Sequence, residues 1–361
     1  MKEQTRVKRL GILKRARKYG YSNARVKGME SKLIGSSTMK SIAEAKSIDA
    51  ILSILFQTDY NASIIKFGGL EISPTLLDFA ISESMAEKLN KLAEITPKDE
   101  QRTIRKITAR WALGNVKLVL EALERGQTYD SISKYIISAD GFGTVMLQEV
   151  MKSESIEQAL SMLMRNRHHK ELLGKVLSRY IKTGSIMDAL AAIDQEHYRE
   201  LGELAVSLGR SGDKSAIILR MDIDMRNMIT LLRAKRKGLK FEDISDTLIR
   251  NGDVGIGALS GMYSSSGNVA EFAAKSKAFD LNAAIELYRE NDQMLPFEVS
   301  MRNQIFNRSI ALLRSSVLSF GTLVDYIYLK EIEVFTIRAL VKAREYGLSK
   351  EEVSRLVIWS L

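Results

Sequence analysis

Residues 115–126 read NVKLVLEALERG, and residues 227–238 read NMITLLRAKRKG. Each segment opens with asparagine and closes with glycine eleven residues later, and between them apolar residues recur at i, i+3, i+4 and i+7. This spacing is typical of one face of an amphipathic helix, and a closing glycine suits the left-handed position that ends helices. Lys235 departs from the pattern, because it stands where the first copy has Leu123. The repeat therefore predicts two equivalent helices, each ending at its glycine.

The similarity continues past both glycines at a constant offset of 112 residues. Apolar residues again occupy matching positions, and their spacing predicts a second helix of the same kind after each first one. The matching pairs are Tyr129 and Phe241, Ile132 and Ile244, Ile136 and Leu248, and Ile137 and Ile249.

Other parts of the chain resemble the same scheme. Residues 336–347, TIRALVKAREYG, reach a glycine over the same span, and Ser349–Glu352 predict a capping box that opens the next helix. Residues 23–35, NARVKGMESKLIG, form a looser copy. The four copies lie 92, 112 and 109 residues apart. They predict three homologous helical units of roughly 110 residues, stacked or arranged around a pseudo-threefold axis.

A second, separate repeat concerns helix starts. Residues 47–55, SIDAILSIL, match residues 155–163, SIEQALSML, at an offset of 108. In each segment a serine precedes an apolar-periodic run, so the serine is predicted to cap a helix.

The composition favours an all-α fold. Only three prolines occur in 361 residues and apolar residues make up 45% of the chain, so long uninterrupted helices around a buried core are expected. There is no cysteine, which excludes disulfides and cysteine-ligated metals. No apolar run reaches the roughly 18–20 residues that span a bilayer, and the basic start lacks the apolar stretch of a secretory signal. We expect a protein that is soluble or at most peripheral to a membrane.

The net charge of +10 is concentrated at the N-terminus. Residues 1–27 hold ten lysines and arginines against one acid, whereas the rest of the chain holds 44 basic and 43 acidic residues. Such an arm is attracted to anionic lipid headgroups, nucleic acid or an acidic protein face, and its alternative is a solvated terminus. The residues predicted to contact a membrane surface are Arg6, Lys8, Arg9, Lys14, Arg15, Arg17 and Lys18.

Signatures of enzymes and metal sites are weak. His168 and His169 lie among basic residues and lack metal-ligand spacing, so solvent-facing histidines are expected. Gly252–Gly257 resembles a dinucleotide loop, but no strand pattern precedes it. A flexible inter-helix loop that continues through residues 260–268, SGMYSSSGN, is expected instead. Gly209–Ser215 resembles a phosphate loop, but Asp213 separates its glycine from its lysine. No catalytic residue, cofactor or metal is predicted.

Three segments resemble the family of the C subunit of archaeal and bacterial A/V-type ATPases, which includes the d subunit of the eukaryotic vacuolar enzyme. YSNARVK at 21–27 is similar to the family's N-terminal motif, DIDMRNMITLLRAK at 222–235 to a central helix, and EIEVFTIR at 331–338 to a C-terminal helix. The resemblance therefore covers essentially the whole chain. Departures are WALG at 111–114, where the family usually has an acidic residue, Thr336 in place of asparagine, and the length of the basic arm.

The resemblance implies a funnel of three similar helical bundles, seated on the membrane proteolipid ring and holding the tip of the central axle. Such a protein has no catalytic site, cofactor or small-molecule substrate, and transmits torque as a peripheral protein at the cytoplasmic face of the membrane. The predicted divisions are an arm at 1–18 and helical units at 19–108, 109–220 and 221–361. The alternative function is a basic helical-repeat module that binds nucleic acid, which would need basic and aromatic residues along a repeat face.

The signature residues are predicted to lie at interfaces. The motifs contain two pairs of acids, Asp222 with Asp224 and Glu331 with Glu333. Acids two residues apart point roughly 200° apart on a helix, so neither pair forms a catalytic dyad. We expect one acid of each pair to make polar contacts between units or with the axle; the alternative is charge that favours a helix N-terminus. Asn23 is predicted to cap its helix and Arg25 to tie neighbouring helices. The complete set is Tyr21, Asn23, Arg25, Asn115, Asp222, Asp224, Arg226, Asn227, Glu331, Glu333 and Arg338.

Overall fold

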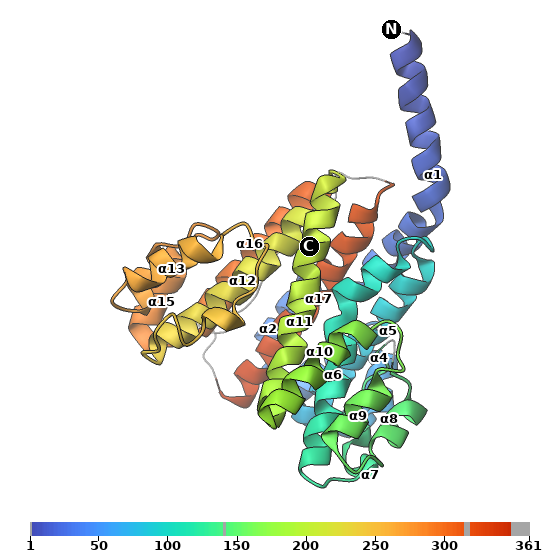
Figure 1. Cartoon of the computed structure of the whole chain (residues 1–361). Coiled ribbons are helices and arrows are strands. Elements are labelled where there is room, and N and C mark those ends of the chain that lie inside the picture. Colours follow the sequence, from blue (N-terminus) through green and yellow to red (C-terminus); the bar gives the residue numbers. More distant parts are fainter. Residues whose placement is uncertain (1, 140–141, 314–317, 348–361) are drawn as a thin grey trace. The chain divides into compact units, whose positions relative to one another are not determined.

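The computed structural model describes residues 2–139, 142–313 and 318–347, with side chains from residue 13 onward except that of Leu70. Every regular element in these ranges is helical, which confirms the predicted all-α class (Figure 1). The chain divides into two compact units. Of the described residues, unit 1 contains those up to His197 and those from Glu333 onward, and unit 2 contains Tyr198–Ile332. The divisions fall within two long helices, α11 (Ile186–Arg210) and α17 (Phe320–Glu345).

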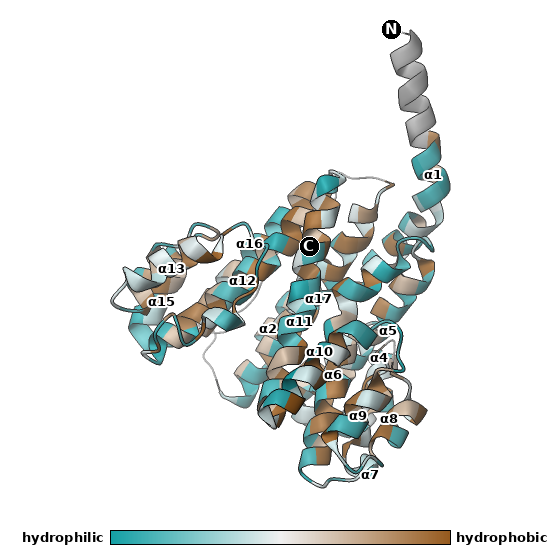
Figure 2. Cartoon of the chain, in the orientation of Figure 1, coloured by the Kyte–Doolittle hydropathy of each residue, from teal (hydrophilic) through white to brown (hydrophobic). Residues whose placement is uncertain are grey.

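Unit 1 is built around a hairpin of two long helices, α5 (Pro74–Ile95) and α6 (Gln101–Glu124). Its buried apolar residues, among them Val116, Leu147 and Leu160, form one core, and Figure 2 shows their helices as brown on one side and teal on the other. The remaining elements of unit 1 are α1 (Lys2–Glu30), α2 (Ser36–Glu44), α3 (Ile48–Leu55), α4 (Asn61–Lys66), η1 (Gly69–Glu71), α7 (Tyr129–Ile132), η2 (Ser133–Tyr135), α8 (Thr144–Val150), α9 (Ile156–Leu163) and α10 (Lys170–Thr183).

Unit 2 is centred on α12 (Ser215–Arg236), which packs against α16 (Leu295–Leu313). Phe272, Phe297 and Phe306 are fully buried between these helices and their neighbours, and each stabilises the fold by about 1.5–3 kcal/mol through burial. The other elements are η3 (Ser245–Thr247), α13 (Ile256–Ser264), α14 (Val269–Ala274) and α15 (Asn282–Asn291).

The helix ends follow the local signals in the sequence. Gly126, Gly238 and Gly347 adopt left-handed φ values of 63°, 70° and 67°, as predicted for glycines that end helices. The residue after each of the first two glycines donates its N–H to the carbonyl five residues back, at 2.9 and 3.1 Å. The predicted serine caps are also confirmed, because Ser47 and Ser155 each accept the N–H of the third residue of their helix at 3.1 Å.

The prediction of a second helix after each closing glycine is wrong. After Gly126, Tyr129 and Ile132 lie in the four-residue α7, and Ile136 and Ile137 follow the short η2. The apolar positions after Gly238 lie around η3. Ile132 and Ile244 are nonetheless buried. Side chains at i and i+3 share one side of a 3₁₀ turn as well as of an α-helix, so the pattern fitted both.

The stretch after Gly252 is also not the flexible loop that was expected. It forms α13, which buries Leu259, and α14, which is capped by Asn268. The Asn268 side chain accepts the Glu271 N–H at 2.9 Å, while the Glu271 carboxylate accepts the Gly267 N–H at 2.7 Å. This reciprocal pair of bonds satisfies two donors at the start of the helix.

The looser copy at 23–35 does not share the geometry of the others. α1 ends at Glu30, and Gly35 has a φ of −70° and precedes α2 rather than ending a helix. The capping box predicted at Ser349–Glu352 lies outside the described residues.

Candidate functional site

Asn115 and Asn227 hold the loop that follows their helix in the same way. Asn115 donates from Nδ2 to the carbonyl of Ile137 at 2.7 Å and accepts the Ile137 N–H at 3.1 Å. Asn227 makes the same two bonds with Ile249, both at 2.8 Å. The asparagines are only 2% and 1% exposed, so they satisfy backbone groups that water does not reach. The sequence repeat is therefore the repeat of a loop clamp, with one copy in each unit.

Asp224 holds the next part of the same loop in unit 2. Its carboxylate accepts the N–H groups of Asp253 at 2.9 Å and Val254 at 3.2 Å. Gly252 lies directly against it, because a β-carbon at this position would be 2.1 Å from Asp224 Oδ1. The Nε of Arg220 adds a bond of 2.6 Å to the carboxylate of Asp253. Glycine is needed at 252 for space.

Burial raises the pKa of the Asp224 carboxyl to about 6, although the two backbone donors and Arg220 act in the opposite direction. Because this pKa lies above the ordinary value of 3.8, the folded protein binds the proton more tightly than the unfolded chain does. We therefore expect the free energy of unfolding of the wild type, relative to Asp224→Asn, to fall by up to about 1.4 kcal/mol per pH unit between about pH 4 and 6, then to level off. Denaturant titrations across that range measure the difference, and a pH-independent difference would contradict this account.

Asp222 and Arg226 lie on the same helix, α12. Asp222 is buried, and the Arg226 guanidinium lies 5.4 Å from the ring centroid of Tyr198, within range of a cation–π interaction. The alternative that the paired acids favour a helix N-terminus is wrong for both pairs. Asp222 lies well inside a helix that begins at Ser215, and Glu331 well inside one that begins at Phe320.

Glu333 on α17 joins two separate parts of unit 1. Its carboxylate accepts the Tyr60 hydroxyl at 2.7 Å and the Ile34 N–H at 2.5 Å, and it is 2% exposed. Glu331, its partner in the sequence motif, is also buried but belongs to unit 2. Ile34 and Tyr60 fall in the first predicted repeat and Glu333 in the third, so this carboxylate contacts residues far apart in the sequence.

Arg338, one turn further along α17, binds α5. Its Nε lies 2.7 Å from Asp78 Oδ1, and its guanidinium also donates to the Ser82 hydroxyl. The guanidinium carbon lies 5.6 Å from the ring centroid of Trp111 on α6. Arg338 therefore ties α17 to both helices of the central hairpin of unit 1.

Replacing Glu333 with glutamine is expected to lower the free energy of unfolding by about 1–3 kcal/mol. The amide keeps one acceptor oxygen, but its nitrogen would face either the Tyr60 hydroxyl or the Ile34 N–H. Guanidinium denaturation measures the change. Glu345→Gln, on the exposed end of the same helix where the carboxylate pairs with Lys342 at 2.6 Å, is the matched control and should change stability by less than about 1 kcal/mol. Equal losses in the two variants would contradict the role of Glu333.

The three residues of the N-terminal motif have different environments on α1. Tyr21 is 68% exposed and Arg25 is exposed, whereas Asn23 is buried. The prediction that Asn23 caps a helix is wrong, because α1 starts at Lys2 and runs through this position. Arg25 makes no hydrogen bond or ion pair with any residue that the structure describes, so the prediction that it ties helices together is not supported.

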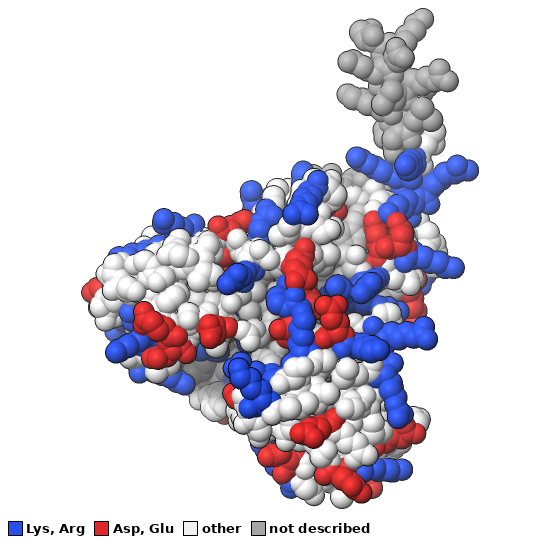
Figure 3. Space-filling model, in the orientation of Figure 1, with Lys and Arg blue, Asp and Glu red and all other residues white. Residues whose placement is uncertain are grey.

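The basic arm is anchored to unit 1 at its base. Lys18 lies 2.7 Å from the carboxylates of both Asp99 and Glu100, and the Tyr19 hydroxyl donates to Glu100 at 2.6 Å. Figure 3 shows acidic side chains beside the base of this helix and basic ones along its described part. Lys14, Arg15 and Arg17 are exposed, and the side chains of Arg6, Lys8 and Arg9 lie outside those that the structure describes. Lys18 is thus an anchor of the arm.

Two of the three histidines are not solvent-facing as expected, because His169 is 6% exposed and His197 is 2% exposed. Burial, together with the charges of His168 and Arg105, lowers the pKa of His169 to about 4, so its ring is neutral at physiological pH. Among the described residues, no group of three or more histidine and acidic side chains is arranged to hold a metal ion. None of the described helices is both long and apolar enough to span a bilayer.

In the region that resembles a phosphate loop, Gly209–Ser215, an acidic side chain already binds the N-terminus of α12. The Asp213 carboxylate accepts the N–H of Ser215, the first residue of α12, at 2.8 Å. The carboxylate thus takes the place beside the helix N-terminus that a phosphate would need.

Sequence reasoning missed one further clamp. Glu83 on α5 is fully buried, forms an ion pair with Lys66, and accepts the N–H of Ser138 at 2.6 Å. Ser138 follows the loop residue that Asn115 holds, so two helices grip the same loop. The available signal was the position of Glu83 between Ala80–Ile81 and Met85–Ala86, since an unpaired buried carboxylate would be costly.

Most of the described signature side chains use their hydrogen bonds inside the protein. Asn115, Asn227, Asp224 and Glu333 fix loops to helices, and Arg338 fixes one helix to two others. Fully satisfied buried polar networks stiffen the structure around them. What this arrangement can do is mechanical, because it holds long helices and their connections in one geometry.

Comparison with known proteins gives consistent matches along the chain. A profile of the ATP synthase (C/AC39) subunit family matches residues 22–356. The C subunit of the A-type ATP synthase of Methanocaldococcus jannaschii is 22% identical over 94% of this chain and 86% of its own length. The proteins of the same name from Thermoplasma acidophilum and Thermococcus gammatolerans are 24% and 25% identical, over 89% and 96% of this chain and 91% of their own lengths.

Proposed function

The chain belongs to the ATP synthase (C/AC39) subunit family, and on this basis we propose that it is a non-catalytic central-stalk component of an A/V-type rotary ATPase. In this role it couples the membrane proteolipid ring to the central axle and transmits torque between them. The observation that carries the proposal is the match to the family over residues 22–356, which includes all three sequence motifs except Tyr21.

The buried clamps support a mechanical role. A coupling protein must pass rotation on without yielding, and its weakest parts are the loops between helices. Here the loop at Ile137 is held by Asn115 and the loop at Ile249 by Asn227. These bonds remove freedom from the segments that would otherwise yield first under load.

The same proposal covers the wider arrangement and the location. We take the three repeats at 19–108, 109–220 and 221–361 to be homologous bundles around a pseudo-threefold axis, forming a funnel that holds the tip of the axle. The protein would sit at the cytoplasmic face of the membrane as a peripheral member of the complex, with no cofactor or small-molecule substrate of its own. Its partners would be the proteolipid ring and the axle subunits.

Native co-purification tests the proposal. The protein is tagged in its own host, the membranes are solubilised gently, and the mass and composition of the complex are determined by native mass spectrometry. We expect recovery with catalytic head subunits and the proteolipid ring. Recovery of the protein alone, or with nucleic acid, from a lysate in which the ATPase is intact would contradict the proposal.

The basic arm distinguishes the proposal from the nucleic-acid alternative. Deleting residues 2–17 leaves Lys18 and its ion pairs in place, so α1 stays anchored to unit 1. Under the proposed function this deletion weakens membrane association at most and leaves the complex assembled. Loss of nucleic-acid binding by a protein that does not assemble with the ATPase would favour the alternative instead.

A further inference from the structure

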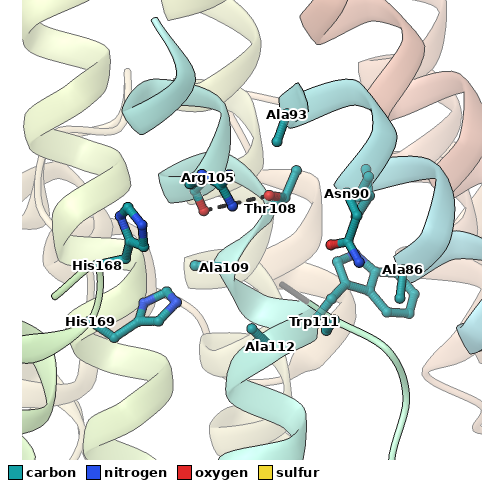
Figure 4. Close-up of a pocket in the computed structure, with 12 residues that line it drawn as sticks. Ala86, Asn90, Ala93, Arg105, Thr108, Ala109, Trp111, Ala112, His168 and His169 are labelled. Carbon is teal, nitrogen blue, oxygen red and sulfur yellow. Dashed lines mark hydrogen bonds between the residues drawn. The ribbon is translucent and has the colours of Figure 1, made fainter. Parts of the chain in front are cut away.

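A hollow lies beside the hairpin of α5 and α6 in unit 1, and Trp111, His168 and His169 are among the residues that line it (Figure 4). Its enclosed space is about 20 Å³, which is room for about one water molecule. The hollow is therefore too small for a ligand, whereas the surface of α1 has room for a partner.

α1 turns one face toward unit 1 and another toward solvent. On the inner face, the Ser22 hydroxyl donates to the Ile95 carbonyl at 2.5 Å, and Val26 is fully buried. On the solvent face, exposed residues recur at intervals of three or four, so they form one stripe along the helix. This outer stripe consists of Leu13, Lys14, Arg17, Tyr21 and Arg25.

The outer stripe carries charge that the rest of the described chain does not neutralise. None of its side chains makes a hydrogen bond, an ion pair or a ring contact with any residue that the structure describes. The acids that contact this part of α1 bind other residues of the helix, because Glu30 pairs with Lys27 at 2.6 Å and both Asp99 and Glu100 pair with Lys18 at 2.7 Å. Figure 3 shows basic side chains projecting from this part of α1. The stripe therefore presents three cations to solvent.

The outer stripe also combines these cations with apolar side chains. Leu13 is 61% and Tyr21 68% exposed, and Tyr21 lies about one turn from both Arg17 and Arg25. In a helix at a membrane surface, apolar side chains enter the boundary below the headgroups while long cationic side chains reach the phosphates. Tyrosine favours this boundary. Single-stranded nucleic acid would instead need several rings on which successive bases stack, and the stripe has one.

We propose that the outer stripe binds the headgroup region of a membrane that contains anionic phospholipid. Its cations contact the lipid phosphates, and Leu13 and Tyr21 enter the boundary below them. The sequence adds charge on the N-terminal side, since residues 2–17 hold seven basic residues and one acid. Each basic residue near an anionic surface strengthens binding by about fivefold. This proposal rests on the proposed function only for the nearness of a membrane.

Vesicle flotation of the full-length protein tests the charge of the stripe. We expect vesicles of phosphatidylcholine mixed with an equal amount of phosphatidylglycerol to bind the protein at least about tenfold more tightly than vesicles of phosphatidylcholine alone. The double variant Arg17→Gln with Arg25→Gln should weaken binding to the mixed vesicles by about 25-fold. Circular dichroism confirms that the variant is folded.

A matched variant separates the stripe from general attraction to basic side chains. Arg165→Gln with Arg167→Gln removes the same charge from two exposed residues between α9 and α10, and it should leave vesicle binding within about threefold of the wild type. Equal weakening by the two double variants would overturn the proposal, because the attraction would then be diffuse.

A fluorescent probe tests whether the stripe enters the membrane boundary. In Tyr21→Trp, the indole emission should move to shorter wavelength on the mixed vesicles and be quenched by brominated lipid, after subtraction of the wild-type signal from the two native tryptophans. Tyr346→Trp, at a position on unit 1 that is 74% exposed, should show neither change. Absence of a shift in Tyr21→Trp, or an equal shift in both variants, would overturn the proposal.

Nucleic acid is tested as the competing partner by titrating the same protein with single-stranded DNA. Tighter binding to DNA than to the mixed vesicles, lost in Arg17→Gln with Arg25→Gln, would assign the stripe to nucleic acid and overturn the proposal. Native co-purification keeps the two proposals apart. Recovery with the ATPase but no vesicle binding overturns the lipid contact alone, whereas vesicle binding without recovery of the ATPase overturns the proposed function alone.

Discussion

Replacing Gly252 with alanine is expected to lower the free energy of unfolding of unit 2 by about 3–5 kcal/mol. The new β-carbon would lie 2.1 Å from Asp224 Oδ1 and 3.3 Å from a methyl carbon of Ile223, so either the carboxylate or the loop must move. The carboxylate cannot move away without giving up the N–H groups of Asp253 and Val254. Movement of the loop has the same consequence, and both routes leave the buried Asp224 carboxylate without its two backbone donors.

Gly257→Ala is the matched control for this prediction. A β-carbon at Gly257 meets nothing within 4 Å, and the residue lies inside α13. Alanine favours a helix over glycine by about 0.5–1 kcal/mol, so this variant should be as stable as the wild type or more stable. Hydrogen exchange of the unit 2 amides measures both variants. Equal protection in the two variants would mean that the contact at Gly252 does not constrain the loop.

Features that depend on neighbours in the sequence could be predicted from the sequence. Gly126 and Gly238 end helices because only a residue without a β-carbon adopts the left-handed conformation at low cost, and Ser155 caps a helix through a bond three residues away. The all-α class follows from the same local propensities summed over the chain. These effects need no knowledge of the rest of the fold.

Predictions that required a choice between similar local shapes were less successful. The apolar positions around Ile132 and Ile244 fit a turn as well as a helix. A short turn forms because the asparagine of the preceding helix binds the backbone of the loop, as Asn115 does at Ile137. The folded structure explains why Lys235 occupies a position that is apolar in the other copy of the repeat. Its ammonium group donates to the carbonyls of Tyr263 and Ser266 at 2.8 and 3.0 Å, at the end of α13.

The contacts of the candidate site also could not be predicted from the sequence. The sequence repeat identified Asn227, and the resemblance to two family motifs identified Asp224 and Glu333. It could not assign their partners, which lie 22 to 299 residues away and are brought close only by the folded chain. The burial of His169 was missed for a related reason, since basic neighbours in the sequence suggested exposure while Phe142 covers the ring in the structure.

Replacing Asn115 or Asn227 with alanine is expected to lower the free energy of unfolding of its own unit by about 2–4 kcal/mol. Each side chain satisfies both the C=O and the N–H of one loop residue, and alanine would leave both groups buried without a partner. Because the two clamps lie in different units and share no partners, the double variant should lose about the sum of the two single losses. Hydrogen exchange of the amides of each unit follows the two losses separately.

The aspartate variants make the test of the clamp geometry sharper. Asn227→Asp keeps an oxygen that accepts the Ile249 N–H but places a second oxygen against the Ile249 carbonyl, where the amide now donates at 2.8 Å. It should therefore destabilise unit 2 at neutral pH at least as much as alanine does, although it is nearly the same size. Asn307→Ala, at an exposed position on α16, is the control and should change stability by less than about 0.5 kcal/mol. If Asn227→Asp were as stable as the wild type, the amide would be filling space rather than holding the loop through paired hydrogen bonds, and the repeated asparagine would need a different explanation in both units.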